Sequence, residues 1–424
     1  MKLEQLHALF LEHPIICTDT RKITENCLFF ALKGPNFNGN EFAKDALEKG
    51  ASYVIIDEQQ DESIANCLLV DDVLETLQKL SIFHRNYSTA KIISLTGSNG
   101  KTTTKELINK VLSKKYNTIA TKGNLNNHIG VPLTLLSIKN DTEIAIVEMG
   151  ANHKGEIAFL SNIAQPDFGY ITNFGKAHLE GFGGVEGVIQ GKSELYDYLI
   201  SNDKYAFLNA DDDIQRNKLG HYIKKYGFST ERSDYYNIKF IEANPFVVIE
   251  VEDKKIETQL IGKYNFSNCC AAILMGKYFN VPLEEIRTAL ESYQPKNNRS
   301  QIIDKNGFKI ILDAYNANPS SMNVALENLK IMDAKNKALI LGDMFELGVD
   351  AEKEHQAIAD LAKSIAFKNV FFVGENFYKT STSFRKFKTF DDLKEVLVQN
   401  PIKKGTLLIK GSRGMALERV LDFL

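Results

Sequence analysis

The strongest chemical signal in the chain is a glycine-bearing loop, TGSNGKTTT, at residues 96–104. An apolar stretch, KIISLT, leads into this loop, and an amphipathic stretch, KELINKVLSKKY, follows it. A strand, a loop and a helix in this order are the context in which a loop binds phosphate groups. Gly97 and Gly100 let backbone N–H groups turn inward, and the start of the helix adds positive charge. Lys101 would reach the β- and γ-phosphates, and the Thr102 hydroxyl would bind Mg²⁺.

The loop departs from the common phosphate-loop pattern at one position. The pattern G-x-x-x-x-G-K-[ST] requires glycine at position 95, where this chain has Leu95. A glycine-rich turn that merely begins a helix is the alternative, but the GKT triplet and its context favour nucleotide binding. The loop residues that we predict to bind ATP are Gly97, Ser98, Asn99, Gly100, Lys101, Thr102 and Thr103.

Three further side chains could support phosphate chemistry. Glu148 follows the apolar run 144–147, and an acid that emerges from a buried strand beside a phosphate loop commonly holds Mg²⁺. An exposed glutamate at a strand end is the alternative. His178 follows a third strand-like run, where a lone histidine is more often structural or exposed. Lys192 lies in a helical pattern, and nothing in the sequence distinguishes it from a solvated lysine.

The elements that position these residues alternate between short β-rich runs and helical patterns, which predicts an α/β protein. We divide the chain into three domains, at residues 1–86, 87–297 and 298–424. In the first domain we predict strands at 27–32 and 52–57 and helices at 41–51 and 73–88, the last of them a connecting helix. In the second we predict a β-hairpin at 246–260.

The third domain carries four strand candidates: FKIILDA, KALILG, NVFFVG and TLLIKG. The helical patterns between and after them lie at 321–332, 351–366, 390–399 and 413–423. This alternation predicts a small Rossmann-like sheet. We expect Ser320 or Ser321, after Pro319, to cap the first of these helices.

Composition excludes several classes of protein. The chain has 424 residues, 44% of them hydrophobic, and a net charge of −3, which does not attract nucleic acid. It has no apolar run of about 18 residues and no signal-peptide pattern, so we expect no membrane partner. Five scattered cysteines without a C-x-x-C motif favour a reducing cytoplasm. We expect a cytoplasmic monomer.

Several segments, in order along nearly the whole chain, resemble the muramyl (Mur) ligase family. They are TGSNGKTTTKE, GNLNNHIGVPLTLL, EMGANHKGEI, TNFGKAHLEGFGG, GKYNFSNCCAA, DAYNANPSSM, LGDMFELG and KGSRGM. The N-terminal segment DTRKITENCLFFALKGPNFNGNEF resembles the part that holds a UDP-sugar. The resemblance implies an N-terminal α/β UDP-sugar-binding domain, a central P-loop domain with a parallel sheet, and a C-terminal Rossmann-like domain.

The resemblance also implies an activity, because NNHIGVPLTLL, DAYNANPSSM and GDMFELG resemble one branch of the family. That branch uses ATP to add D-alanyl-D-alanine to UDP-N-acetylmuramoyl-tripeptide. The family transfers the γ-phosphoryl group to a carboxylate, and an amine then attacks the acyl phosphate. Substrates divided over three domains suggest that the C-terminal domain closes onto the central one.

For the metal site, the resemblance implies two Mg²⁺ ions. Thr102 and Glu148 would hold one ion, and Glu148, His178 and Lys192 the other, with Lys192 carbamylated. The implied catalytic residues are therefore Lys101, Lys192 and His178. A role for His178 as a base is an alternative to metal binding.

For the substrates, the resemblance implies that Asn265 and Asn268 contact adenine and that Arg299 and Asp313 contact the nucleotide. The family often has histidine at position 264, where this chain has Tyr264, which leaves the role of that side chain open. Arg413 could hold a carboxylate, such as that of the dipeptide. The implied substrate-binding residues are Asp19, Thr20, Arg21, Asn126, Asn127, His128, Tyr315, Asn316, Asn318 and Arg413.

Other functions remain open at this point. The chain could be another Mur-family or folylpolyglutamate-type ligase with a different substrate. A regulatory NTPase that hydrolyses GTP would carry an N-K-x-D-type loop, and only Asn202-Asp203-Lys204, in the wrong order, comes near it. A non-catalytic nucleotide-binding module would have no need of the set Glu148, His178 and Lys192.

Overall fold

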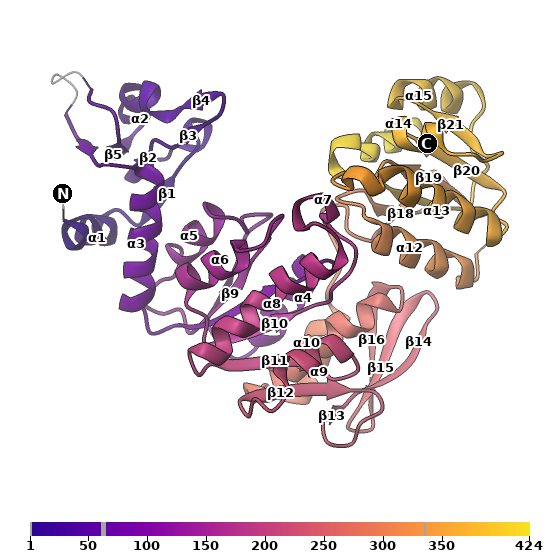
Figure 1. Ribbon diagram of the computed structural model, residues 1–424, viewed down its shortest axis with the longest axis horizontal. Helices are drawn as coiled ribbons and strands as arrows, with labels where there is room; N and C mark the ends of the chain where they lie inside the picture. Colours follow the sequence, from indigo (N-terminus) through magenta and orange to yellow (C-terminus); the bar gives the residue numbers. More distant parts are fainter. Residues whose placement is uncertain (1, 61–64, 335) are drawn as a thin grey trace.

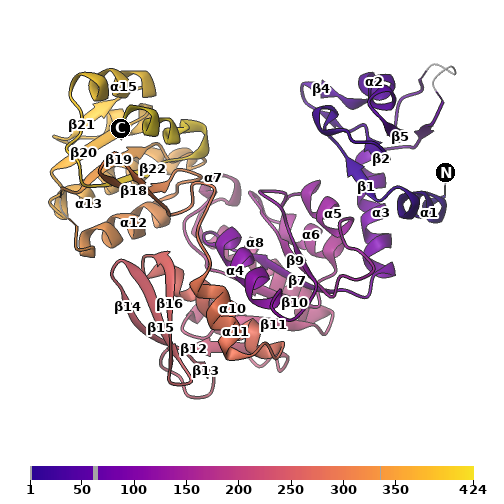
Figure 2. The ribbon, with the colours of Figure 1, turned by 180° about the vertical axis from the view of Figure 1, so that it is seen from behind.

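The computed structural model describes residues 2–60, 65–334 and 336–424. The chain forms three α/β regions (Figure 1). The N-terminal and C-terminal regions lie at opposite ends of the middle region, and the view from behind agrees (Figure 2). The predicted α/β class with a parallel sheet in the middle region is confirmed. The domain boundaries at 86/87 and 297/298 remain predictions.

The N-terminal region contains, in its described part, a parallel sheet of four strands in the order β1-β2-β5-β6. The predicted strands are present, and the predicted connecting helix is α3, which carries Leu77 and Leu80 fully buried on one face. The elements are α1 Leu3–Glu12, β1 Ile15–Cys17, η1 Thr20–Lys22, β2 Cys27–Phe30, β3 Lys33–Gly34, β4 Phe37–Asn38, η2 Gly39–Phe42, α2 Ala43–Glu48, β5 Ala51–Ile56, β6 Cys67–Leu69 and α3 Val73–Tyr87.

The middle region holds a parallel sheet in the order β13-β12-β11-β10-β7-β9-β8. An antiparallel sheet β14-β15-β16 contains the predicted hairpin. The elements are β7 Lys91–Thr96, α4 Lys101–Leu112, β8 Thr118–Ala120, α5 Gly130–Leu135, β9 Ile144–Glu148, α6 Glu156–Ala164, β10 Phe168–Ile171, α7 Leu179–Phe182, α8 Val185–Ser201, β11 Tyr205–Asn209, α9 Asp213–Leu219, β12 Lys225–Ser229, β13 Tyr236–Asn237, β14 Lys239–Ala243, β15 Phe246–Val251, β16 Lys254–Ile261, α10 Tyr264–Tyr278 and α11 Leu283–Glu291.

The order of these strands explains where the site forms. Strand β7 lies between β10 and β9. Because parallel strands end at the same edge of a sheet, the phosphate loop after β7 lies beside Glu148 at the end of β9. The segment that follows β10, from Thr172 onward, reaches the same edge. Three stretches that are far apart in the sequence therefore converge.

The C-terminal region has a sheet in the order β17-β18-β22-β19-β20-β21, with β17 antiparallel to β18. All four predicted strands are present, and β17 and β21 are two that the sequence analysis missed. The elements are β17 Gln301–Lys305, β18 Phe308–Asp313, α12 Pro319–Ile331, β19 Ala338–Gly342, η3 Gly348–Asp350, α13 Ala351–Ser364, β20 Asn369–Val373, α14 Glu375–Lys379, β21 Arg385–Phe387, α15 Phe390–Gln399, β22 Thr406–Lys410, η4 Arg413–Met415 and η5 Leu417–Phe423.

Two predictions for this region were wrong. The cap of α12 is Asn318, not a serine: its side chain accepts a hydrogen bond from the backbone N–H of Ser321. Pro319 takes the first helical position, where its missing N–H costs nothing. The pattern at 413–423 forms two 3₁₀ helices instead of an α-helix. Ala416, between them, has a left-handed φ of 46°, which interrupts helical hydrogen bonding.

Among the helices that the structure describes, none has the length and apolarity needed to cross a membrane.

Candidate active site at the boundary of two domains

A cavity of about 730 Å³ lies where the edge of the middle sheet meets the C-terminal region. It brings together most of the residues that the sequence analysis singled out. The predicted residues that line it are Ser98, Asn99, Gly100, Lys101, Thr102, Thr103, Asn126, Asn127, Glu148, His178, Asn265, Asn268, Arg299, Asp313, Tyr315, Asn316 and Asn318.

Hydrogen bonds from the segment after β10 fix the position of the phosphate loop. The Thr172 hydroxyl and the Asn173 amide donate to the Asn99 carbonyl at 2.6 and 3.0 Å, and the Asn173 side chain accepts from the Asn99 N–H at 3.1 Å. A Cβ at Gly97 would lie 2.0 Å from the Thr172 hydroxyl, so only glycine fits there. The Lys101 ammonium donates to the Gly97 carbonyl at 2.6 Å. Burial lowers the pKa of Lys101, an effect that nearby Glu148 opposes and Arg299 reinforces.

Glu148 lies at the base of the loop, with only 1% of its surface exposed. One carboxylate oxygen accepts from the Thr102 hydroxyl at 3.2 Å and from the Asn126 amide at 2.8 Å. The other oxygen has no hydrogen-bond partner among the described residues, and the Lys105 ammonium lies 3.7 Å from it. A buried carboxylate beside a hydroxyl is an oxygen donor set of the kind that Mg²⁺ prefers. Among the described residues, no group of three or more His, Cys, Asp or Glu side chains is arranged so that it could hold a metal ion.

Lys192 proves to be far from a solvated lysine. Its side chain is fully buried in α8, its ammonium group donates to the Ala151 carbonyl at 3.1 Å, and it lies 4.8 Å from the centroid of the Phe182 ring. Burial lowers the pKa of Lys192 well below its usual value, and the charge of Lys101 lowers it further. Lys192 does not itself line the cavity, although Ala151 does.

His178 lines the cavity from the corner before α7. Its Nδ1 atom contacts the carboxylate of Glu346, which comes from the C-terminal region. Glu346 was not singled out from the sequence, because nothing in its local pattern indicates a partner about 170 residues away.

The predicted adenine-binding residues begin helix α10. The Asn268 amide donates to the Asn265 side chain at 2.8 Å, and the Asn265 amide donates to the Ile261 carbonyl at 2.8 Å. Asn268 also accepts from the Thr104 hydroxyl at 3.0 Å, which fixes it against the phosphate loop. The Tyr264 hydroxyl and the Ser300 hydroxyl lie 2.6 Å apart, and burial raises the pKa of Tyr264.

The C-terminal region contributes a buried ion pair to the cavity. The Lys410 ammonium, on a side chain only 2% exposed, donates to the Asp313 carboxylate at 2.6 Å. The other oxygen of Asp313 accepts from the Ser300 N–H at 3.0 Å. The Arg299 guanidinium lies 3.6 Å from the centroid of the Tyr315 ring, within the range of cation–π contact. Lys410 was missed because a lysine that ends a strand has no local signal for burial.

Several predicted residues lie outside the cavity. Asp19, Thr20 and Arg21 lie in the N-terminal region, where the Arg21 guanidinium makes two hydrogen bonds to the Asp19 carboxylate at 2.8 and 2.9 Å. His128 is exposed, and its carbonyl accepts from Gln78 at 3.0 Å. Arg413 is exposed, and its guanidinium lies 5.4 Å from the centroid of the Tyr315 ring.

Comparison with known proteins covers almost the whole chain. Three family profiles match: "Mur ligase family, catalytic domain" at residues 14–91, "Mur ligase middle domain" at 95–276 and "Mur ligase, glutamate ligase domain" at 298–413. The chain is 35% identical to the UDP-N-acetylmuramoyl-tripeptide–D-alanyl-D-alanine ligase of Bacillus subtilis (strain 168), over 96% of this chain and 92% of that protein. It is 33% identical to the protein of the same name from Escherichia coli (strain K12), over 96% and 93%.

Solved structures give the same result. A crystal structure of MurF from Acinetobacter baumannii superposes with a TM-score of 0.85 at 29% identity, covering 99% of this chain and 98% of that one. MurF from Thermotoga maritima, solved in complex with ADP, also superposes with a TM-score of 0.85, at 26% identity and 97% coverage of both chains. With matching profiles in order along the sequence and relatives aligned over nearly its full length, the chain belongs to the Mur ligase family.

Proposed function

We propose that the chain is an ATP-dependent ligase that joins D-alanyl-D-alanine to UDP-N-acetylmuramoyl-tripeptide in the synthesis of peptidoglycan precursors. One observation carries this proposal: relatives that bear this activity in their names align over 96% of the chain. The cavity supports it, because a phosphate loop faces polar side chains from a second domain across a space large enough for a nucleotide.

The reaction begins by bringing two anions together. A carboxylate of the precursor must approach the γ-phosphate of ATP, and their repulsion is the main barrier to overcome. Lys101 and the backbone N–H groups of residues 97–102 offset it by binding the phosphates. The phosphoryl group passes to the carboxylate, giving ADP and an acyl phosphate. The amine of D-alanyl-D-alanine then attacks the acyl carbon, and phosphate leaves.

We propose that Thr102 and Glu148 hold one Mg²⁺ ion and that Glu148, His178 and a carbamylated Lys192 hold a second. The unpartnered oxygen of Glu148 supports the first assignment. The lowered pKa of Lys192 supports the second, because only a neutral amine adds CO₂ to form a carbamate. When bound, the ions would neutralise charge on the transferring phosphoryl group. Lys105, 3.7 Å from Glu148, offsets part of the carboxylate charge.

The remaining contacts divide among the three domains. We propose that Asn265 and Asn268 bind adenine and that Arg299 and Asp313 bind the rest of the nucleotide, with Lys410 fixing the Asp313 carboxylate. The UDP end of the precursor would bind Asp19, Thr20 and Arg21. Its peptide would pass along Asn126, Asn127 and His128. The dipeptide would bind near Tyr315, Asn316, Asn318 and the exposed guanidinium of Arg413.

The activity is tested by measuring phosphate release with ATP and Mg²⁺. UDP-N-acetylmuramoyl-tripeptide and D-alanyl-D-alanine are added separately and then together. Release that requires both substrates is expected. Equal release without either substrate would instead identify a regulatory NTPase, and would overturn the proposal.

The role of Lys192 is tested by Lys192→Ala, with Lys110→Ala, an exposed lysine of α4, as the matched control. We expect the first variant to lose about 10–100-fold in kcat, with partial recovery when a small carboxylate is added to stand in for the carbamate. The control should keep full activity. Full activity of Lys192→Ala would remove the proposed role.

The proposed substrates and ATP are cytoplasmic metabolites, so we propose that the enzyme works in the cytoplasm, as a monomer of three domains with boundaries at 86/87 and 297/298. Size-exclusion chromatography with light scattering tests the monomer. A mass near twice the 47.7 kDa of one chain would contradict it.

A further inference from the structure

Two unusual backbone corners meet at the boundary between the middle and C-terminal regions. His178 has a φ of 53° and Glu346 a φ of 61°, so both lie in the left-handed region. Residues with a Cβ avoid this region unless the surrounding structure enforces it, and such residues gather at functional sites. The Glu346 carboxylate contacts Nδ1 of His178. Each corner therefore turns its side chain toward the other.

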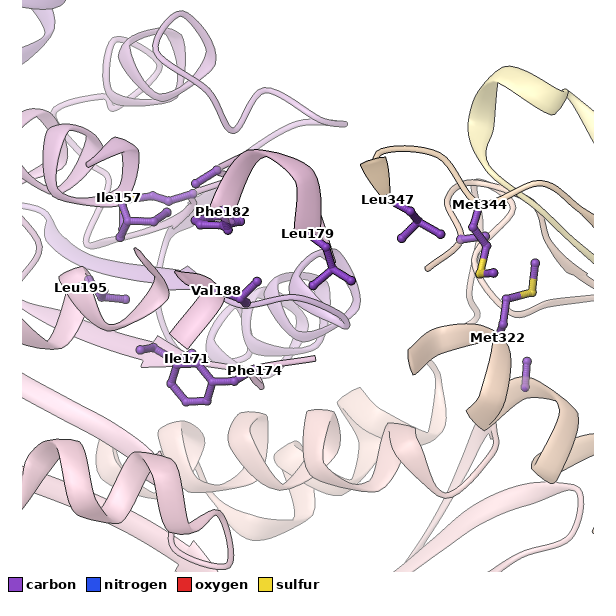
Figure 3. Packing of buried hydrophobic residues seen from close by; sticks show 14 of the residues in the cluster. Ile157, Ile171, Phe174, Leu179, Phe182, Val188, Leu195, Met322, Met344 and Leu347 are labelled. Carbon is purple, nitrogen blue, oxygen red and sulfur yellow. The ribbon is translucent and has the colours of Figure 1, made fainter. Parts of the chain in front are cut away.

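The surrounding contacts hold the two corners in register. The Glu180 N–H donates to the Glu346 carbonyl at 3.4 Å, and Gly348 packs against the Glu180 side chain. Leu179 and Leu347, which follow the two corners, belong to the same hydrophobic cluster and are almost fully buried (Figure 3). The helix α7 after His178 packs against η3 after Glu346. Backbone, apolar and charged contacts between the two corners therefore hold Glu346 next to His178.

His178 lines the cavity, whereas Glu346 does not. Nδ1 of His178 is buried and makes no hydrogen bond of normal geometry among the described residues. The polar group in contact with it is the Glu346 carboxylate. A carboxylate against one nitrogen of an imidazole fixes the orientation of the ring and leaves the other nitrogen for the site.

We propose that Glu346 is a positioning residue: it orients His178 in the reaction cavity, so that the catalytic centre of the middle domain is complete only when the C-terminal domain is docked. The proposal rests on the ligase function proposed above. In this proposal, the Glu346 side chain couples docking of the C-terminal domain to the chemical step.

A second ion pair at the same boundary provides a matched control. The Lys176 ammonium donates to the Glu354 carboxylate at 2.7 Å, and the Lys176 N–H donates to the Ser320 hydroxyl at 2.9 Å. This pair also joins the middle and C-terminal regions, but neither Lys176 nor Glu354 lines the cavity. If Glu346 only helped to hold the domains together, loss of either carboxylate would have the same consequence.

The experiment compares Glu346→Gly, Glu346→Gln and Glu354→Gln in the full-length enzyme. Glycine removes the carboxylate yet adopts the left-handed backbone freely, so Glu346→Gly separates the side chain from the fold. For this variant we expect kcat to fall about 10–100-fold, while KM for ATP stays within about 2-fold. Glu346→Gln keeps an acceptor for the imidazole and should recover part of the rate. Glu354→Gln should keep kcat.

Small-angle X-ray scattering with ADP gives the second readout. Glu346→Gly should reach the same radius of gyration as the unmodified enzyme, because the substitution changes the orientation of His178 and not the docking of the domains. Unchanged kcat in both Glu346 variants would overturn the proposal. Equal losses in the Glu346 and Glu354 variants, or a loss of compaction that accounts for the fall in kcat, would also overturn it. Failure of the unmodified enzyme to require both substrates would instead contradict the proposed function.

Discussion

The two boundaries of the middle domain are built differently. On the N-terminal side, helix α3 is packed into the middle domain: Leu136 of the middle domain belongs to the same buried cluster as Leu77 and Leu80 of α3. The Arg85 guanidinium, 12% exposed, pairs with Asp167 at 2.9 Å and also donates to the Ala164 and Gln165 carbonyls. Asp167 accepts in addition from the Ile92 N–H and from Lys204.

On the C-terminal side, each ion pair contains one side chain that is far more exposed than Arg85 or Asp167. Lys176 is 46% exposed and Glu346 is 53% exposed. The Asn318 amide donates to the Asn99 side chain at 2.8 Å, and Leu179 and Leu347 belong to one hydrophobic cluster. Exposed ion pairs contribute little because water and salt screen them. We therefore expect the C-terminal boundary to separate and form again during turnover more readily than the N-terminal boundary.

The largest effect that we expect comes from Asp167→Ala at the N-terminal boundary. This change leaves Arg85 and Lys204 without their carboxylate in a site where Asp167 is only 15% exposed. Removing one partner of a buried ion pair costs about 3–5 kcal/mol. Urea unfolding would measure the loss, and Asp203→Ala, which removes a 77% exposed partner of Lys224, is the control. A loss no larger than that of the control would contradict the comparison.

Next in size is Leu347→Ala at the C-terminal boundary. Truncating this side chain, which is 2% exposed, should weaken docking by about 2 kcal/mol, because apolar contact with the middle domain is lost. We expect a larger radius of gyration in small-angle scattering with little change in the unfolding of the middle domain. Val349→Ala changes a neighbouring, fully exposed side chain and should behave like the unmodified protein.

A smaller effect concerns pH. His7 and His84 lie 3.1 Å apart in the buried contact of α1 with α3, and His84 also contacts the Ile138 carbonyl of the middle domain at 2.9 Å. Burial lowers the pKa of both imidazoles from 6.5, and their proximity lowers the pKa of His7 further. Below about pH 6.5 the unfolded chain therefore binds more protons than the folded chain. The stability that is present above about pH 6.5 is lost as the pH falls.

The measurement is Tm between about pH 7.5 and about pH 5. His7→Leu removes one of the two titrating groups, so its Tm should fall less steeply than that of the unmodified protein. Parallel curves for the two proteins would show that this pair does not set the acid sensitivity of the N-terminal boundary.

The smallest effect is expected from Lys176→Met, which breaks the ion pair between the half-exposed Lys176 and Glu354, whose side chain is 9% exposed. The free energy of unfolding should change by about 1 kcal/mol or less, and high salt should reduce the difference. A loss comparable to that of Asp167→Ala would mean that the C-terminal boundary is held as firmly as the N-terminal one.

The sequence by itself determined the elements whose signals are local. The strand and helix around the phosphate loop, the hairpin and the four C-terminal strands follow from apolar periodicity, and the observed bounds agree closely. The loop itself was identified because its chemistry resides in consecutive residues. Where a local signal was ambiguous the prediction failed, as at Asn318, where three cap-forming residues compete, and at 413–423, where Ala416 interrupts the helix.

Only the tertiary structure decided which polar residues are buried and which meet. Lys192 resembles any surface lysine in the sequence, yet it is fully buried. Asn173, Lys410 and Glu346 contact partners 74, 97 and 168 residues away, respectively. Burial and pairing depend on how strands are ordered and how domains dock, and these arise from contacts across the whole chain, which no local pattern encodes.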